Sequence, residues 1–329
     1  MLSKRWWLEL GCVVGIISLS GALLFPKYYD AVVVKHNRLP PIPPPKGRPL
    51  YSLKDAGEGD DGWLDAQGKV IAKTFRRLAW HEEGATLVEV GQGKSERWEV
   101  TWRGKTYDLG NRWQQDLRNP VANAKGQLAL TVFGRPLLWF EGKWTPLLPG
   151  DQRGTVTGLN AQGQAVGVVA RQAYLWSGTT GKPLLNRPST AAAINDRGDI
   201  IGALGESHAT GYFWQKGTVK EFTAPLYSGE IAYLNPVALN ERADVVGNAG
   251  LVPPTDAKHQ STAPWSSPFV WQQGRTTLLE GRIEQQGKWV LDAALAINDR
   301  GEILVRGHEQ GKTYPSHLLL LTPRVGIAP

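Results

Sequence analysis

A single cysteine, Cys12, stands in a chain of 329 residues. It falls in an apolar N-terminal run, so the rest of the chain can form neither a disulfide framework nor a cysteine-based metal site. The six histidines show no metal-ligand spacing. The chain also lacks a Gly-rich phosphate loop, a serine nucleophile elbow and a metalloprotease helix motif. The sequence therefore predicts no metal and no cofactor, and it points to no catalytic residue.

The net positive charge is small beyond the N-terminal part. The net charge is +7, but residues 1–48 carry seven Lys/Arg against two acidic residues, which leaves only +2 for residues 49–329. Nucleic-acid binding needs a basic face on the folded domain. We therefore expect no nucleic-acid partner, whereas the basic N-terminal part suits contact with anionic lipid.

The N-terminus carries a long apolar stretch. Lys4 and Arg5 precede residues 6–25, which are mostly apolar and about long enough to span a bilayer. Positive charge before the stretch favours a cytoplasmic N-terminal end. We therefore predict a signal-anchor transmembrane helix at residues 1–27. The protein would be a single-pass protein of the inner (cytoplasmic) membrane, with the remainder on the periplasmic or extracellular side.

A cleaved signal peptide is the alternative. Small residues at 18, 20 and 22 could form a cleavage site. The apolar run continues to Phe25, however, which is longer than a usual signal core and favours the uncleaved anchor. Six prolines between residues 38 and 49 then favour an extended polyproline conformation. We therefore predict a semi-rigid stalk over residues 28–48.

The hexapeptide AINDRG occurs at 193–198 and again at 296–301. Alignment on its glycine reveals six copies of one pattern, in which Asn or Asp is followed three positions later by Gly, or once by Ala. The polar positions are Asp65, Asn123, Asn160, Asn195, Asn240 and Asn298. Asn or Asp can bond the backbone of a tight turn through its side chain, and Gly accepts a positive φ. Each copy therefore predicts strand, tight turn, strand.

A second pattern trails each copy: an apolar strand that ends in Trp, a polar turn with Gly, and another strand. The tryptophans are Trp102, Trp139, Trp176, Trp214 and Trp271, spaced by 37, 37, 38 and 57 residues. Two hairpins per unit make four strands, and the period is close to that of propeller blades, about 40–50 residues. Such units bury both faces only when several pack around an axis.

Six units are countable, so we predict an all-β fold: a six-bladed β-propeller over residues 49–329, within a range of five to seven blades. The uneven spacing predicts insertions near 83–97 and 250–266. The last unit lacks a fourth strand, whereas residues 48–55 resemble a fourth strand without a blade. We therefore expect the first segment to pair with residues 316–322 and to close the ring.

These motifs resemble the HAF-type repeats, the "probable extracellular repeat" family, whose units read roughly Ala-Ile-Asn, a Gly turn, Val-Val-Gly, Phe-Leu-Trp, Gly and Asp-Leu-Gly. The segments AAAINDRGDIIG at 191–202 and GYFWQKG at 211–217 match best, and TWRGKTYDLG at 101–110 supplies a tail. The resemblance covers roughly residues 60–323. It implies a β-propeller, often extracytoplasmic, and it implies no reaction.

Four residues are candidates for ligand binding. Trp113 and Trp265 lie in a turn or an insert, where amphipathic rings serve at contact surfaces. Arg197 and Arg300 recur beside the Asn turns, and a ring of arginines near one rim could attract an anion. Packing between blades for the tryptophans, and plain solvent contact for the arginines, are the competing interpretations.

The leading functional hypothesis is a membrane-anchored extracytoplasmic propeller that acts as a non-catalytic binding or scaffolding module in the cell envelope. Its partner would be an envelope protein or a polysaccharide. The alternative is a polysaccharide lyase or hydrolase with its site in the propeller channel, where carboxylates distant in sequence could meet as an acid–base pair. The His-Glu dipeptide at 308–309 is expected in a solvated loop.

Overall fold

A computed structural model describes most of the chain after the N-terminal part. The described residues are 48–72, 80–82, 85–90, 97–111, 117–205, 208–225, 230–252, 265–312 and 315–324. All regular elements within them are β-strands, and none of them is a helix that could cross a membrane. The predicted transmembrane helix and nearly all of the predicted stalk lie outside the described residues, so both stay predictions.

The strands form six sheets of four or five strands and one of two. The two-stranded sheet comprises β2 (Gly62–Leu64) and β3 (Val70–Ala72). The next two sheets comprise β4 (Trp80–Glu82), β5 (Ala85–Val90), β6 (Arg97–Trp102) and β7 (Lys105–Asn111), then β8 (Leu117–Ala122), β9 (Leu128–Val132), β10 (Arg135–Phe140) and β11 (Lys143–Pro146). Two more comprise β12 (Gly154–Leu159), β13 (Gln164–Val169), β14 (Gln172–Ser177) and β15 (Thr180–Pro183), then β16 (Ser189–Ile194), β17 (Ile200–Leu204), β18 (Thr210–Gln215) and β19 (Thr218–Phe222).

The remaining two sheets contain the longest strands, β20 and β25, of ten and nine residues. One comprises β20 (Glu230–Leu239), β21 (Val245–Val252), β22 (Trp265–Gln272) and β23 (Arg275–Leu278). The other, in spatial order, comprises β24 (Ile283–Glu284), β1 (Tyr51–Glu58), β27 (His317–Pro323), β26 (Ile303–Glu309) and β25 (Trp289–Ile297). Sheets of consecutive antiparallel strands are the expected result of short hairpin connections.

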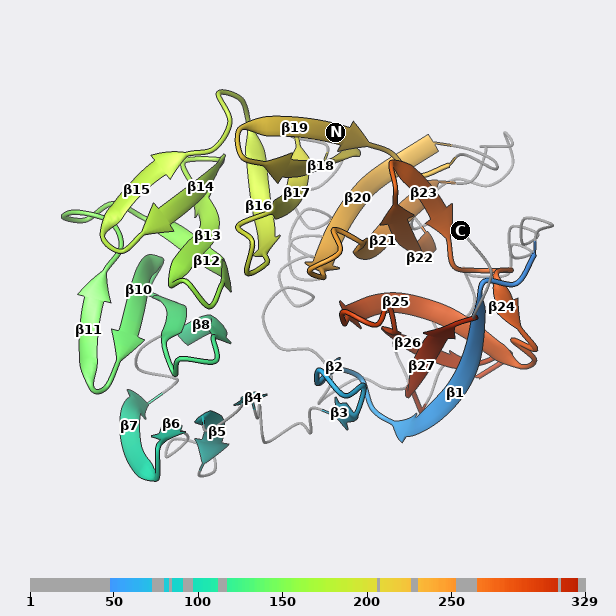
Figure 1. Ribbon diagram of the computed structural model, residues 1–329, viewed down its shortest axis with the longest axis horizontal. Coiled ribbons are helices and arrows are strands. Elements are labelled where there is room, and N and C mark those ends of the chain that lie inside the picture. The colour runs from blue at the N-terminus through green and yellow to red at the C-terminus, as the bar shows by residue number, and fades with distance from the viewer. Residues whose placement is uncertain are drawn as a thin grey trace, which may run out of the picture. The chain divides into compact units, whose positions relative to one another are not determined.

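The sheets are arranged around a common centre, and the first strands of successive sheets, β8, β12, β16, β20 and β25, lie innermost (Figure 1). Each of these inner strands contacts the inner strand of the next sheet, from β8 through to β25. This is a propeller-like arrangement, and the prediction of an all-β fold is confirmed. The repeated tryptophans fill the space between sheets: Trp139 and Trp176 are fully buried.

The two ends of the ring are joined as the sequence predicts. Strand β1 pairs antiparallel with β27, in a register that sets Tyr51 opposite Pro323 and Leu53 opposite Leu321. Tyr51 is buried in the core of this last sheet. The strand from the start of the described chain therefore completes the sheet from its end, and the expected pairing of residues 48–55 with 316–322 is confirmed.

Gly167 and Gly202 each follow two apolar residues and lie opposite an inner strand that carries a bulge. The register between β16 and β17 shifts between Ala191 and Ala193, three residues before Asn195. A Cβ on Gly202 would lie 1.8 Å from Thr190 O of the partner strand. Gly167 meets Thr155 O at the same distance. A glycine is required at this position because only glycine lacks the clashing atom.

The first unit differs from its predicted form. The tight turn that begins at Asp65 joins the two strands of sheet β2–β3. Trp102 lies in the separate sheet β4–β7, so the two do not share a blade. The predicted insertion at 83–97 contains β5, which pairs with β6 along its whole length. The prediction of an insertion was therefore wrong for residues 85–90, which form a strand of a four-stranded sheet. His308 was likewise wrongly expected in a loop, since it lies on β26.

Candidate functional site

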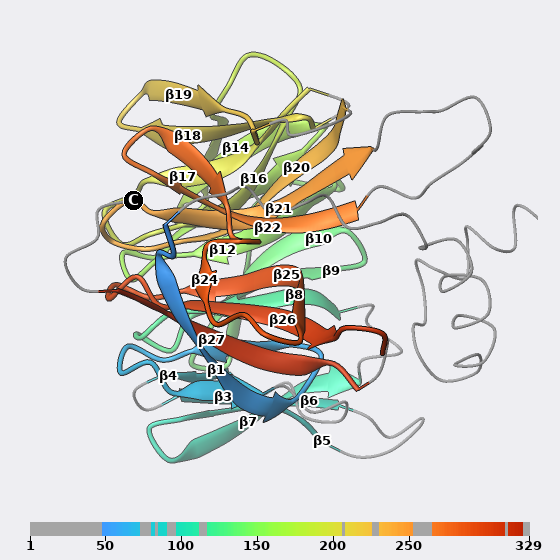
Figure 2. The same cartoon turned by 90° about the vertical axis from the view of Figure 1, so that its right-hand side faces the viewer.

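Alternation of antiparallel strands gives the ring two faces. The turn from the first to the second strand of a sheet and the turn from the third to the fourth lie on one face, which we call the corner face. The remaining connections lie on the opposite face, which we call the loop face. Figure 2 shows the β18–β19 hairpin on the left, and the far ends of β20, β21 and β22 projecting to the right. Figure 1 therefore looks onto the corner face.

The corner face is held by a ladder of asparagine side chains. Each Nδ2 donates to the main-chain carbonyl of the next Asn along the ring. The distances are 2.8 Å from Asn123 to Asn160, 3.1 Å from Asn160 to Asn195, 3.1 Å from Asn195 to Asn240 and 3.0 Å from Asn240 to Asn298. All five side chains are buried. The ladder ties five successive corners together.

Asparagine is used here to its full hydrogen-bonding capacity. Asn160 Oδ1 accepts from the amides of Gln162 and Gln164 at 3.1 and 2.9 Å, which shapes its own turn. Asn160 Nδ2 donates to Gln164 Oε1 at 2.9 Å and to Asn195 O at 3.1 Å. Both donors and both acceptor sites are thus occupied. The acceptor four positions after each Asn is Gln127, Gln164, Asp199, Asp244 or Glu302.

The link between the last corner and the first is made differently. Asp65 has no side-chain amide, and its Oδ1 accepts from within its own turn, from the amide of Lys69 at 2.7 Å. The guanidinium of Arg300 donates to the carbonyl of Gln67 instead. An arginine side chain therefore joins the corner at Asn298 to the corner at Asp65.

Carboxylates form a second ladder on half of the corner face. Asp196 Oδ1 accepts from the amide of Ala161 at 2.7 Å, Glu241 Oε1 from the amide of Asp196 at 2.7 Å, and Asp299 Oδ1 from the amide of Glu241 at 2.8 Å. Charged hydrogen bonds of this kind are stronger than neutral ones. The corners at Asn195, Asn240 and Asn298 therefore carry an additional set of links to their neighbours.

The predicted arginines belong to this network. Arg197 Nη2 lies 2.6 Å from Asp199 Oδ2, and its Nε lies 3.8 Å from Glu241 Oε2. Arg300 Nη2 lies 2.6 Å from Glu302 Oε2. The six corners, each counted from its Asn or Asp over five residues, hold seven carboxylates against five cations. This surplus of negative charge does not favour an anion, although anion binding by the two arginines stays untested.

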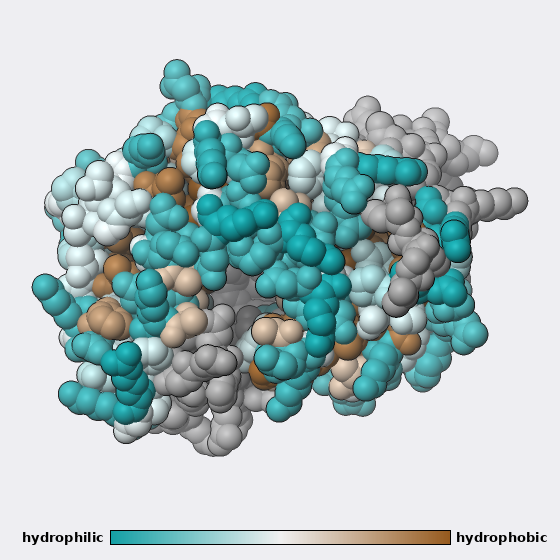
Figure 3. Space-filling view, in the orientation of Figure 1, coloured by the Kyte–Doolittle hydropathy of each residue, from teal (hydrophilic) through white to brown (hydrophobic). Residues whose placement is uncertain are grey.

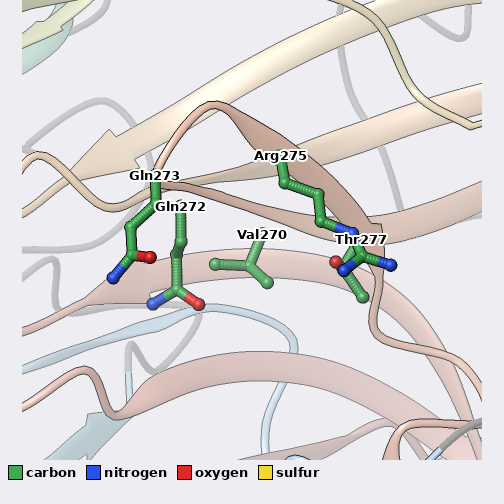
Figure 4. A pocket seen from close by; sticks show the side chains of 5 residues that line it. All are labelled: Val270, Gln272, Gln273, Arg275 and Thr277. Carbon is green, nitrogen blue, oxygen red and sulfur yellow. The ribbon is translucent and has the colours of Figure 1, made fainter. Parts of the chain in front are cut away.

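Hydrophilic residues cover most of the corner face, and apolar residues show only as separate spots (Figure 3). One small cavity, about 120 Å³, lies beside the β22–β23 hairpin and is lined by Val270, Gln272, Gln273, Arg275 and Thr277 (Figure 4). Ligand pockets usually measure about 300–1,000 Å³. The cavity is therefore too small for anything but a very small polar ligand.

The loop face carries an exposed aromatic side chain at a turn. Phe133 joins β9 to β10, has φ of 48°, and is 51% exposed. Phe140, at the other end of β10, lies on the corner face and is 38% exposed. The guanidinium of Arg153 donates to Phe133 O at 3.0 Å. A phenylalanine therefore lies at each end of β10, one on each face of the ring.

The structure describes one of the two tryptophans that the sequence offered as ligand-binding candidates. Trp265 is the first residue of β22 and pairs with Leu251 of β21, so its backbone lies at the projecting end of this sheet on the loop face. Trp113 lies outside the described residues. The structure therefore does not bring Trp265 together with Arg197 or Arg300, which lie on the opposite face.

A cluster of titratable groups that the sequence did not reveal lies where β23 leads into β25. His308 Nδ1 is 2.9 and 3.0 Å from the two carboxylate oxygens of Asp292. The hydrogen bond to Asp292 raises the pKa of His308, and burial opposes this. Burial is the main cause that raises the pKa of the Glu280 carboxyl close by, and the charge of Asp292 adds to it. No three His, Cys, Asp or Glu side chains in the described part of the chain are placed to hold a metal ion.

No protein-family model matches the chain, and no curated protein matches it. Among solved structures it is similar to the β-propeller domain of the trilobed protease from Pyrococcus furiosus, with 12% identity, 84% of each chain covered and a TM-score of 0.42. It is also similar to the Cps50 (Swd1) β-propeller domain from Myceliophteria thermophila, with 11% identity, 85% of this chain and 98% of that chain covered and a TM-score of 0.42.

A third similar structure is a gluconolactonase from Xanthomonas campestris, with 12% identity, 84% of this chain and 99% of that chain covered and a TM-score of 0.35. Likenesses this distant assign neither an activity nor a partner to the chain.

Proposed function

We propose that the protein is a membrane-anchored, extracytoplasmic binding module that takes an envelope protein or polysaccharide on its loop face. The observation that carries this proposal is the contrast between the two faces. On the corner face, the asparagine and carboxylate ladders join the polar groups of neighbouring corners to one another. On the loop face, Phe133 is half exposed and the β20–β22 sheet projects with Trp265 at its end.

Exposed aromatic side chains on a rigid scaffold are typical anchors of binding surfaces. Phe133 gains little from its position in the folded domain, because it is 51% exposed and its backbone lies in the left-handed region. That region is costly for a bulky residue. Contact with a partner is a physical reason for a phenylalanine at such a place.

Membrane anchoring belongs to the proposal and is supported by the sequence alone. Residues 6–25 are apolar and follow Lys4 and Arg5. The proline-rich segment before β1 would hold the ring away from the lipid. Six blades are part of the same proposal: the six sheets of four or five strands would each be one blade, and β2–β3 would be an additional hairpin in the ring.

Intact-cell crosslinking of alanine variants tests the proposed binding face. Phe133→Ala and Trp265→Ala should lose the crosslinked partner, whereas Phe140→Ala should keep it. The partner is identified by mass spectrometry and must crosslink to this protein again when it is itself used as bait. Loss with Phe140→Ala and retention with both other variants would place the partner on the wrong face and contradict the proposal.

A catalytic function is a second candidate, and the cluster of Glu280, Asp292 and His308 is the observation that favours it. Two carboxyl groups in different surroundings, together with a histidine, can divide the roles of acid and base. A polysaccharide lyase or hydrolase would need all three. Release of reducing or unsaturated ends from envelope polysaccharides, abolished by Glu280→Gln, would support this candidate in place of the binding module.

A further inference from the structure

A strap made of residues 279–288 holds the strand that closes the ring. It connects β23 to β25, and its short strand β24 runs parallel along the free edge of β1 (Figure 1). The register pairs Tyr51 with Ile283. The amides of Leu50 and Tyr51 both donate to Arg282 O, at 2.7 and 3.2 Å. Strand β1 therefore lies between β27 and the strap, with pairing on both edges.

Glu280 organises the strap from inside. Gln286 Nε2 donates to Glu280 Oε1 at 2.5 Å and to Trp289 O at 2.9 Å. The amide of Leu291 also donates to the Glu280 carboxyl. Gln286 Oε1 in turn accepts from the amide of Gly281 at 3.3 Å. One carboxyl group thus ties the beginning of the strap to its end and to the first residues of β25.

The groups that face Glu280 come from β25 and β26 of the last sheet. Asp292 is the extra residue of a bulge in β25, between Leu291 and Ala293. Its side chain is 27% exposed, and that of its partner His308 on β26 is 23% exposed. Arg306, also on β26, acts on His308 through its charge. Two carboxyl groups, one histidine and one arginine therefore share this half-buried place.

We propose that the strap is a proton-responsive clamp on the closing strand β1, controlled by Glu280 together with the Asp292–His308 pair. In acid, Glu280 is neutral and His308 carries a positive charge between two acidic partners. When both protons have left, two carboxylates lie near each other in a partly dry place, and the imidazolium that balanced the charge of Asp292 is gone. Like charges in low dielectric repel strongly, so the strap loosens.

The direction of the effect follows from the two pKa shifts. The pKa of Glu280 is raised above its ordinary 4.5, and that of His308 above its ordinary 6.5. A group whose folded-state pKa is raised contributes stability in full below its ordinary pKa and loses it as the pH rises through the raised value. Both groups therefore stabilise the clamp in acid. The contribution of Glu280 fades as the pH rises above 4.5, and that of His308 fades as the pH rises above 6.5.

Hydrogen exchange of the Leu50 and Tyr51 amides measures the clamp directly, because both bond the strap. The full-length protein in detergent micelles is compared at about pH 5 and about pH 8, with correction for the intrinsic exchange rate. Protection at these two amides should fall severalfold toward pH 8. Protection of the Asn160 amide, which bonds Gln164 O on the corner face, should stay constant and so reports on global opening.

Two variants separate the clamp from a merely structural role of these residues. Glu280→Gln keeps the size and one acceptor oxygen but stays neutral at every pH, so it should remove the contribution of Glu280 to the pH dependence. His308→Gln should remove the remainder. Glu284→Gln, which changes the ion pair of the same strap with Arg324, should leave the slope unchanged. An unaltered slope in both Glu280→Gln and His308→Gln would overturn the proposal, whatever the partner of the loop face proves to be.

Discussion

The side-chain amide of Asn195 donates to the main-chain carbonyl of Asn240 at 3.1 Å, across 45 residues of sequence. The same group shapes its own turn, since Asn195 Oδ1 accepts from the amides of Arg197 and Asp199. One side chain therefore sets both the local turn and the distance to the next sheet. This double task explains why the repeat keeps asparagine where aspartate would satisfy the turn alone.

Replacement of this asparagine by aspartate should destabilise the protein. Asn195→Asp removes both donors, leaves the buried Asn240 carbonyl without its partner, and sets a second carboxylate beside Asp199. An unsatisfied buried group costs about 1–3 kcal/mol, and repulsion from Asp199 adds to it. Asn160→Asp, which faces the neutral Gln164, should lose less. Urea unfolding of both variants measures which of them loses more stability. Equal stability of Asn195→Asp and the wild type would contradict this prediction.

Alanine at Gly202 should be far more damaging than its size suggests. The added Cβ would lie 1.8 Å from Thr190 O, a backbone atom of the paired strand β16. Overpacking of a well-packed site typically costs about 1–3 kcal/mol or more. Gly59→Ala is the matched control, because its nearest neighbour is the side chain of Leu318 at 3.0 Å, which can move. Thermal unfolding should show a large loss for the first variant and a small one for the second.

Much of the fold follows from short-range chemistry. The turns at Asn195 and Asn298, the buried tryptophans such as Trp139 and the pairing of β1 with β27 could all be predicted, because each depends on local turn preference or on an unpaired strand. The two ladders could not, since they join residues of different sheets.

The departures have equally physical causes. Asp65 fits the repeat, yet its sheet ends at Ala72 and Trp102 belongs to the next sheet. The spacing of the motifs alone could not show that the Asp65 turn and Trp102 belong to different sheets. Glu280 and His308 are 28 residues apart and meet only because β25 and β26 form a hairpin beside the strap. No local motif encodes such a meeting.

Asparagine at position 133 should raise stability and lower partner binding. Phe133 and Gly134 form a two-residue turn with both φ values positive, a turn for which Asn-Gly is strongly preferred. Phe133→Asn should therefore gain about 0.5–2 kcal/mol, the usual gain from a consensus-type substitution, while it removes the exposed ring. Lys216→Asn, at the equivalent position of a turn on the corner face, should gain similarly and keep the partner. A parallel fall of stability and binding in Phe133→Asn would argue against a surface selected for contact.

Glu309 should affect the acid limb of the stability profile. Hydrogen bonds from Lys288 and Lys312 lower the pKa of Glu309 to about 2. A lowered folded-state pKa contributes stability above the ordinary value of 4.5 and loses it as the pH falls toward 2. Glu309→Gln should therefore reduce the loss of stability below about pH 4.5. It should leave the change in stability at higher pH, which the clamp governs, as it is in the wild type. Thermal unfolding between about pH 2 and 7 measures this, with Glu221→Gln as the control.

The most direct test of the account compares one photo-crosslinking amino acid placed at 133 with the same amino acid placed at 140. Both positions carry an exposed phenylalanine. Position 133 lies in the turn before β10 and position 140 is the last residue of β10, so they lie at opposite faces of the ring. Illumination of intact cells should give a discrete adduct from position 133 and none from position 140. An adduct from position 140 with none from 133 would contradict the assignment of the loop face as the binding surface.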